Sequence, residues 1–327
     1  MNRDQTEGSY IYPLYPSPQE RSYIRKMYSN TAWALILSEV IMYILSFISL
    51  IVIYACGYSP RLNDENAIIL DPPMILSSYT SVTFALIIVS AIFGRYFHFR
   101  LSDIFGTEKL TLQKVFLTVV VSLGAANTCY VINIIMNNVM YMNGYELASN
   151  AAAPDTPEGI AADVIASVLL APVFEEIFYR GIIMRSLCRV SKRFAIFASA
   201  LVFGLIHGNP MQLVLGFVVG IVFGYADIKT DSVIPSMVAH IAINSHLYVY
   251  DLFTGEYSDL IYLCFVGAYI IAGTAALLYT LKKYGLEFPR SSYYHKQRTL
   301  PVIVRSLPAW VFVIYSVYTV ISSVEKI

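Results

Sequence analysis

Three ionisable side chains lie close together in an apolar stretch of the sequence. Glu175, Glu176 and Arg180 occur in FEEIFYRG, between ASVLLAPV and IIM. An ionised side chain at the centre of a bilayer costs about 2.5–3.5 kcal/mol on insertion scales, so such residues mark functional sites by default. Glu176 and Arg180 are one helical turn apart, which predicts an ion pair. Glu175 is rotated by about 100° around the helix axis, which leaves its carboxylate free for chemistry.

Two histidines and an asparagine lie in other apolar segments. His240 and Asn244 are four residues apart, so an imidazole and an amide should point into the same space. His207 follows Phe203 at the same spacing. With a rise of about 1.5 Å per residue, Glu175, His207 and His240 lie at overlapping depths in their segments. A buried carboxylate can act as a general base on water, and His and Asn can donate to an oxyanion.

The elements that position these residues are predicted to be membrane-spanning helices. The chain has 327 residues, 57% of them hydrophobic and 13% charged, whereas a soluble domain has about 25% charged residues. A spanning helix needs about 20 predominantly apolar residues. We therefore expect an all-α, polytopic bundle of about eight or nine spans. The candidate segments are 31–55, 74–94, 115–137, 160–187, 194–208, 211–227, 233–251, 258–281 and 306–323.

Charge in the connecting segments predicts the orientation of the chain. Lys and Arg recur in the N-terminal tail and after the second, fourth and eighth segments, whereas Asp and Glu dominate after the first, third and seventh. The positive-inside rule then places the N-terminus in the cytoplasm and the C-terminus outside. We expect a multi-pass protein of a bacterial cell membrane. A formal net charge of zero gives no case for nucleic acid, whereas the basic loop 282–306 should contact anionic membrane lipids.

The chain divides into four parts on this interpretation. Residues 1–30 form a cytoplasmic tail, 31–155 the first three spans, 156–252 a catalytic core and 253–327 the C-terminal helices. Cysteines are scattered without CxxC spacing, so neither a disulfide framework nor a thiolate metal site is indicated. Outside the core, Glu39 is the one carboxylate well inside a predicted span, where it could pair with a basic group.

Three polar motifs occur in order along the core. EEIFYR fits EExxxR, FGLIH fits FxxxH and HIAIN fits HxxxN, over about residues 160–250. Between the second and third lies a helix with glycine at every fourth position, expected to pack closely against a neighbour: Gly216, Gly220 and Gly224. Together the motifs resemble the CPBP family of intramembrane proteases, which includes the type 2 CAAX prenyl proteases and the bacterial Abi proteins.

The resemblance implies a role for each motif residue. Glu175 and His207 would activate a water molecule, and His240 and Asn244 would stabilise the oxyanion. Glu176 and Arg180 would form a structural ion pair at the site. The family is commonly labelled metalloprotease, which makes zinc a possible cofactor, with His207, His240 and Glu175 as its ligands. The HExxH spacing is absent, and a metal-free glutamate mechanism is equally compatible.

The predicted function is therefore intramembrane hydrolysis of a peptide bond in a peptide or lipidated protein substrate. One alternative is a non-catalytic membrane scaffold or regulator that keeps the polar cluster for structure. Another is a proton-coupled transporter, for which the sequence shows no internal repeat. His246 lies two residues beyond Asn244, on a different helix face, and is not expected in the site.

Overall fold

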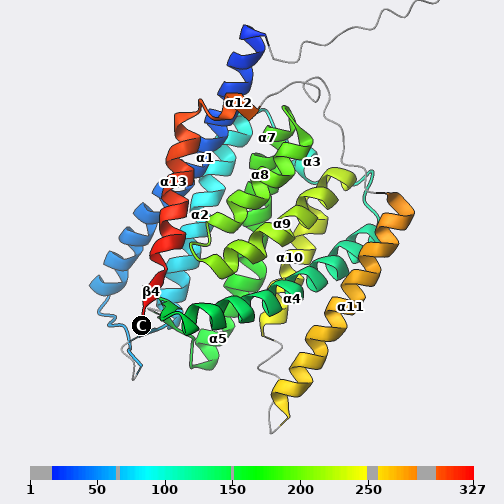
Figure 1. The fold of residues 1–327 in the computed structure, drawn as a ribbon. Helices are drawn as coiled ribbons and strands as arrows, with labels where there is room; N and C mark the ends of the chain where they lie inside the picture. Colours follow the sequence, from blue (N-terminus) through cyan, green and yellow to red (C-terminus); the bar gives the residue numbers. More distant parts are fainter. Residues whose placement is uncertain (1–16, 64–66, 149–150, 249–256, 286–299) are drawn as a thin grey trace, which may run out of the picture.

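The computed structural model describes residues 17–63, 67–148, 151–248, 257–285 and 300–327. The fold is all-α, and the predicted helical bundle is confirmed (Figure 1). Each predicted span coincides with a helix or a continuous series of helical segments. These are α1 (Pro18–Ala55), α2 (Pro72–Tyr96), α4 (Leu112–Met142), the series from α5 to α7 within 157–188, α8 (Lys192–Leu205), α9 (Pro210–Thr230), α10 (Ile234–Leu247), α11 (Ser258–Tyr284) and α13 (Leu307–Ser322).

Fewer single helices are long enough for a full crossing than there are predicted segments. Among the described residues, five helices are long and apolar enough to cross a membrane, namely α1, α2, α4, α9 and α11. Helices α8 and α10 have 14 residues each and α13 has 16, short of the roughly 20 that a crossing needs. The chain is an integral, multi-pass membrane protein in which short helices share the interior with long ones.

The series at 157–188 departs from a regular α-helix in two places. Segments α5 (Pro157–Asp163), α6 (Ala171–Glu176) and α7 (Arg185–Cys188) alternate with two π-helical segments, η1 (Val164–Leu170) and η2 (Ile177–Met184). A π-segment is an i→i+5 hydrogen-bonded stretch, often found at functional sites. The two predicted catalytic-site glutamates close α6, between the two π-segments.

Helices α8 and α9 begin at defined caps and pack closely. The side chains of Ser191 and Asn209 accept hydrogen bonds from the backbone N–H of Phe194 and Gln212, which fixes where each helix starts. A Cβ atom on Gly216 would lie 2.8 Å from Cα of Gly204, closer than real Cβ contacts allow. The glycine stripe therefore packs α9 against α8, as its spacing predicts.

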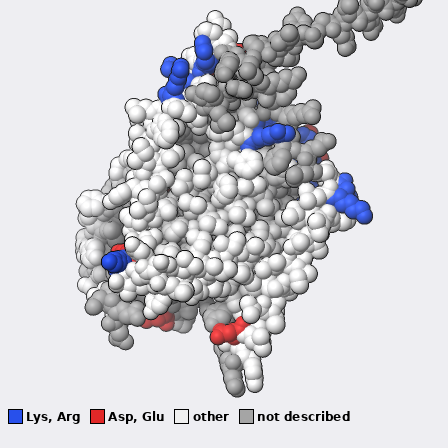
Figure 2. Space-filling view, in the orientation of Figure 1, with Lys and Arg blue, Asp and Glu red and all other residues white. Residues whose placement is uncertain are grey.

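The segments predicted to lie outside pair with one another as short strands. Strand β1 (Ile68–Ile69), after α1, pairs with β3 (Ala151–Ala152), after α4, and β2 (Tyr145–Leu147) pairs with β4 (Val324–Lys326) at the C-terminus. These four strands belong to segments predicted outside. Figure 2 shows Lys and Arg mainly at the end where α1 begins, separated by a band of uncharged surface from acidic groups near the other end.

Two groups of helices flank the central ones. Figure 1 shows α1, α2 and α13 on one side of α8, α9 and α10 and α11 on the other, while α4 runs across the bundle from α11 toward the end that carries β4. Helix α1 contacts both α2 and α13, and α4 contacts α9, α10 and α11. Short helices α3 (Leu101–Ile104) and α12 (Leu300–Ile303) lie in connections. The central helices carry the residues that the motifs single out.

Candidate active site

The predicted ion pair is present and fully buried. Nη1 of Arg180 donates to Oε1 of Glu176 at 3.1 Å, and both side chains have no exposed surface. The guanidinium lies between two aromatic rings, 4.1 Å from the centroid of Phe203 and 5.2 Å from that of Phe223. Cation–π attraction and the carboxylate together offset the cost of burying the charge. Arg180 thus joins η2 to α8 and α9.

His240 lies between the two adjacent glutamates. Its Nδ1 is 3.0 Å from Oε1 of Glu176, and its Nε2 is 3.9 Å from Oε2 of Glu175. The sequence predicts that Glu176 pairs with Arg180 and that Glu175 faces the histidines. The structure adds a second partner for Glu176, because α10 places an imidazole in contact with both carboxylates. Adjacent residues on one helix can flank the two nitrogens of a ring supplied by another helix.

His207 is held by its own helix in one tautomer. Its Nδ1 is 2.7 Å from the carbonyl oxygen of Phe203, and a carbonyl can only accept, so Nδ1 carries the proton. In the neutral ring, Nε2 is then left as an acceptor. The ring of Phe203 packs edge-on against both His207 and His240. The FxxxH spacing therefore orients the histidine through the backbone of Phe203, whose ring also contacts His240.

Asn244 has a structural partner that the sequence does not reveal. Its Nδ2 donates to the carbonyl oxygen of Ser167, in η1, at 2.8 Å. In this π-segment the N–H of Ala171 bonds to the carbonyl of Ala166. The same register would pair the Ser167 carbonyl with the nitrogen of Pro172, which has no hydrogen. Asn244 thus supplies the donor that the proline lacks and ties α10 to η1.

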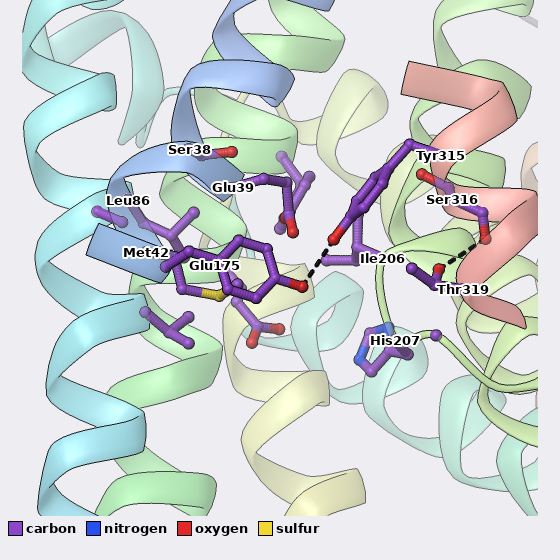
Figure 3. Close-up of a pocket in the computed structure, with 15 residues that line it drawn as sticks. Ser38, Glu39, Met42, Leu86, Glu175, Ile206, His207, Tyr315, Ser316 and Thr319 are labelled. Carbon is purple, nitrogen blue, oxygen red and sulfur yellow. Dashed lines mark hydrogen bonds between the residues drawn. The ribbon is translucent and has the colours of Figure 1, made fainter. Parts of the chain in front are cut away.

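A cavity of about 350 Å³ opens beside this cluster (Figure 3). Glu175 and His207 both line it, and Figure 3 shows their side chains reaching it from different segments. Helices α1, α2 and α13 supply much of the remaining wall. The lining residues are Ser38, Glu39, Met42, Tyr43, Val82, Ala85, Leu86, Glu175, Tyr179, Ile206, His207, Gly208, Tyr315, Ser316 and Thr319. The volume lies within the range of roughly 300–1,000 Å³ typical of ligand pockets.

The structure gathers the predicted catalytic residues unequally. Glu175 and His207 line the cavity, whereas His240 is nearly buried behind it, in contact with Glu175. Asn244 is not among the lining residues and has one amide hydrogen bonded to Ser167. The predicted joint projection of His240 and Asn244 into one cavity is thus not what their contacts show. They instead brace α10 against two different parts of the 157–188 series.

The predicted zinc ligands do not form a ready site. Within the described ranges of the chain, no three His, Cys, Asp or Glu side chains stand close enough together to hold a metal ion. The Nδ1 contacts of His207 and His240 with protein oxygens do not decide the question, because zinc-binding histidines make the same contacts. The spacing of the groups does decide it, and the set of His207, His240 and Glu175 does not fit zinc in this arrangement.

Sequence reasoning missed two carboxylates near the site. Asp227, near the end of α9, is buried and accepts hydrogen bonds from the backbone N–H and the hydroxyl of Ser236 at 3.2 and 2.6 Å. It fixes the junction between α9 and α10. The sequence feature that could have pointed to Asp227 is an acidic residue near the end of the glycine-spaced apolar helix. Glu39 was noted as intramembrane, but nothing in the sequence placed it in the same cavity as Glu175.

His246 lies away from the cavity, as predicted from its helix face. Its Nε2 is 3.0 Å from Oδ1 of Asn127 in α4, and its ring packs on Tyr262 and Tyr269 of α11. This histidine holds α10 against the second flanking group of helices. The candidate active site is therefore confined to the face of the core that meets α1, α2 and α13.

Comparison with known proteins finds a partial family match and one similar protein. Residues 157–246, from α5 to α10, match the family model described as "Type II CAAX prenyl endopeptidase Rce1-like". A Bacillus subtilis protein named "Putative membrane peptidase YdiL" is 24% identical over 234 residues, which cover 70% of this chain and 91% of that relative. No solved structure matches the chain significantly. Over residues 157–246, the chain is thus similar to the Rce1-like type II CAAX prenyl endopeptidases, the resemblance that its motifs predicted.

Proposed function

We propose that this protein is an intramembrane endopeptidase that hydrolyses a peptide bond with a water molecule activated by Glu175. One observation carries the proposal: Glu175 and His207 line a single cavity inside a helical bundle, with His240 3.9 Å behind the Glu175 carboxylate. A nucleophilic serine or cysteine is not needed for this chemistry, because a carboxylate can take the proton from water directly. The family match supports the same reaction class.

In the proposed first step, water in the cavity loses a proton to the Glu175 carboxylate and attacks the carbonyl carbon of the scissile bond. The Nε2 lone pair of His207 would accept a hydrogen bond from the same water and orient it. This role uses the tautomer that the Phe203 carbonyl imposes on the ring. Correct orientation of reacting groups contributes as much as proton transfer, so both residues are needed. The proton held by Glu175 then passes to the departing amine.

His240 would stabilise the negative charge that develops on the carbonyl oxygen. Its Nδ1 is held 3.0 Å from the Glu176 carboxylate and its Nε2 lies 3.9 Å from Glu175, so a proton on Nε2 would be directed at the Glu175 side of the site. A donor fixed in a water-poor site stabilises an oxyanion without reorganising during the reaction. Asn244 would act mainly as a positioning residue for α10, since one amide hydrogen is bonded to Ser167.

The proposed substrate is a peptide or lipidated protein segment that reaches the cavity from the membrane. The helices that line the cavity beside the core include α1 and α13, whose outer faces carry many exposed apolar side chains. These faces would lie against lipid, so a membrane-associated substrate would approach between them. The name of the matched family refers to prenylated substrates, and that substrate class is one candidate for this chain.

The test is peptide hydrolysis by the purified full chain in lipid nanodiscs. A defined mixture of unmodified and prenylated peptides is incubated with the parent, with Glu175→Gln and with Glu158→Gln, and products are identified by mass spectrometry. Glu158 is exposed and lies in α5, at the start of the same helical series, so it is a matched control. The proposal predicts products with the parent and with Glu158→Gln, and none above background with Glu175→Gln.

Metal dependence is tested on the same samples. A carboxylate mechanism predicts that prolonged dialysis against a chelator leaves activity within about twofold, and that purified protein contains far less than one zinc per chain. Activity that falls with the chelator and returns with zinc would instead require the ligand set to rearrange. If Glu175→Gln unfolds while the parent shows no hydrolysis, the polar cluster serves structure and the chain acts as a scaffold or regulator.

A further inference from the structure

The cavity is lined by two parts of the chain, one inside the residues that match the family model and one outside them. The family-matched core supplies Glu175, Tyr179 and His207, which adjoin the proposed chemistry. Helices α1, α2 and α13 lie outside residues 157–246, and they supply the rest of the wall. A wall outside the matched core can differ between relatives while the chemistry stays the same. It is the natural place for residues that select the substrate.

Glu39, in α1, is the charged residue of that wall. Figure 3 shows its side chain directed into the same cavity as Glu175. No hydrogen bond or ion pair joins the Glu39 carboxylate to any residue in the described parts of the chain. A carboxylate inside a membrane protein is costly unless it is paired or serves a function. Glu39 is therefore open to a partner from outside the described parts of the chain.

The other intramembrane carboxylates of the core differ from Glu39 in this respect. Glu176 is bound by Arg180 and His240, Asp227 by Ser236, and Glu175 has His240 nearby. Each of these contacts comes from a neighbouring element of the protein itself. Among the described residues, Glu39 faces the cavity and has no such polar contact. The contrast indicates that the protein supplies a polar neighbour to each of the first three carboxylates and leaves the fourth open to a ligand.

The cavity wall around Glu39 suits a cation. Tyr43 and Tyr315 line it, and their hydroxyl groups are hydrogen bonded to each other at 2.6 Å, joining α1 to α13. Tyr179 lines it from the core. Aromatic faces attract ammonium and guanidinium groups, and phenol oxygens accept their hydrogen bonds. No Lys or Arg is among the lining residues, so the protein supplies no competing cation there.

We infer that Glu39 forms a subsite for a positively charged group of the substrate, an ammonium or guanidinium close to the scissile bond. The inference rests on the proposed function, because it places the subsite in the cavity where Glu175 would act. A Lys or Arg side chain would lay its apolar stem along Met42 and Leu86 and bring its charge to Glu39. The free amine of a peptide N-terminus would offer the same charge, and the experiment separates the two.

The first test measures binding and does not depend on catalysis. Fluorescently labelled, N-acetylated peptides that differ only in Lys or Gln at one position are titrated against Glu175→Gln in nanodiscs, together with a Gln peptide that keeps its free amine. A charge-assisted contact predicts that one cationic peptide binds at least ~10-fold more tightly than the acetylated Gln peptide. Adding Glu39→Gln should remove that ratio. Equal binding of all three peptides, or a ratio that survives Glu39→Gln, overturns the inference.

The second test uses cleavage by the parent chain. Peptides with Lys, Arg, Gln or Glu at each position near the cleaved bond are compared for the parent, Glu39→Gln and Glu39→Lys. The subsite predicts that Glu39→Gln slows only the cationic peptides, by about 10-fold, and that Glu39→Lys shifts preference to the Glu peptides. Glu158→Gln should leave the preference unchanged. If Glu39→Gln is fully active and its peptide preference is unaltered, the subsite is overturned but the proposed hydrolysis is not. If the parent cleaves no peptide, the proposed hydrolysis is overturned, and the binding test alone decides whether the subsite exists.

Discussion

Oε1 of Glu176 contacts Nδ1 of His240 at 3.0 Å and Nη1 of Arg180 at 3.1 Å. A single carboxylate oxygen thus joins a guanidinium from its own helical series to an imidazole from α10. The ion pair predicted from i,i+4 spacing is part of a larger arrangement that sets the position of His240. Because His240 also faces Glu175, a change at Arg180 should be felt at the proposed catalytic carboxylate.

Replacement of Arg180 by leucine should destabilise the protein strongly. It leaves the buried Glu176 without its counter-charge, and breaking a buried pair in this way typically costs about 3–5 kcal/mol. Thermal unfolding in nanodiscs, followed by intrinsic fluorescence, measures the effect. Arg185→Leu is the matched control, since Arg185 pairs with the exposed Asp231 and such pairs contribute about 0–1 kcal/mol. Similar destabilisation by both variants would contradict the buried network.

Asn244 should be energetically coupled to Pro172. Asn244→Ala removes the donor to the Ser167 carbonyl, and an unsatisfied buried group costs about 1–3 kcal/mol. Pro172→Ala supplies a backbone N–H in the register of that carbonyl, so the double variant should lose less than the sum of the single losses. A double-mutant cycle of unfolding free energies measures this coupling. Asn138→Ala, at an exposed asparagine of α4, is the control and should show no coupling to Pro172→Ala. If the unfolding free energies of Asn244→Ala and Pro172→Ala are also additive, the assignment is refuted.

The contact between α8 and α9 should not tolerate a side chain at Gly216. A Cβ there would meet Gly204 at 2.8 Å, so Gly216→Val must push the helices apart and displace His207 at the end of α8. We expect the free energy of unfolding to fall by about 1–3 kcal/mol and hydrolysis to be lost. Gly267→Val in α11 is the control, because a Cβ at Gly267 has no neighbour within 4 Å. Wild-type behaviour of both variants would show that close approach is not required.

A surface ion cluster should give the outer loops a dependence on acid pH. Arg61 bonds the carboxylates of Asp71 and Asp155, joining the loop after α1 to the loop after α4. Hydrogen bonds from the Arg61 guanidinium hold the pKa of both carboxyls below their ordinary value of 3.8. A carboxyl with a lowered folded-state pKa stabilises the fold above its unfolded value, and the stabilisation is lost as pH falls through the folded value.

At neutral pH the parent should be more stable than Arg61→Met, and this difference in stability should be lost below about pH 3.8. Melting temperatures of the two proteins, compared in steps from pH 7 to pH 3, measure this difference. Lys326→Met is a control, since Lys326 lies in exposed β4 and takes no part in the cluster. A difference between the parent and Arg61→Met that stays constant over the whole range would show that the cluster does not contribute through these carboxyls.

Sequence patterns were sufficient for the features that depend on one helix at a time. The apolar segments, the Glu176–Arg180 pair and the packing role of the glycine stripe follow from periodicity and spacing, and the structure contains all of them. The connections predicted to share one side of the membrane pair with each other as strands, whereas the orientation itself stays a prediction. These properties are local, because each depends on residues within a few turns of one another or on the composition of one connection.

Features that depend on contacts between helices were not predictable. The π-segments change the direction of the Glu175 side chain and the backbone that Asn244 contacts. No residue pattern predicts an i→i+5 register. His240 contacts Glu176 because α10 crosses the end of α6, a fact of tertiary packing. Glu39 shares a cavity with Glu175 although the two are far apart in sequence. Only the packed bundle brings such groups together.

The central claim is that Glu175 activates the water, and a single-turnover rate measures this most directly. A peptide cleaved by the parent is mixed with excess Glu175→Gln, Glu175→Asp or Glu158→Gln in nanodiscs, and product is followed at saturating enzyme. General base catalysis contributes about 10²–10⁴-fold, so Glu175→Gln should fall at least ~100-fold in rate with unchanged peptide affinity and melting temperature. Glu175→Asp should recover part of the rate, and Glu158→Gln should match the parent. A folded Glu175→Gln that cleaves within about threefold of the parent rate would contradict the claim.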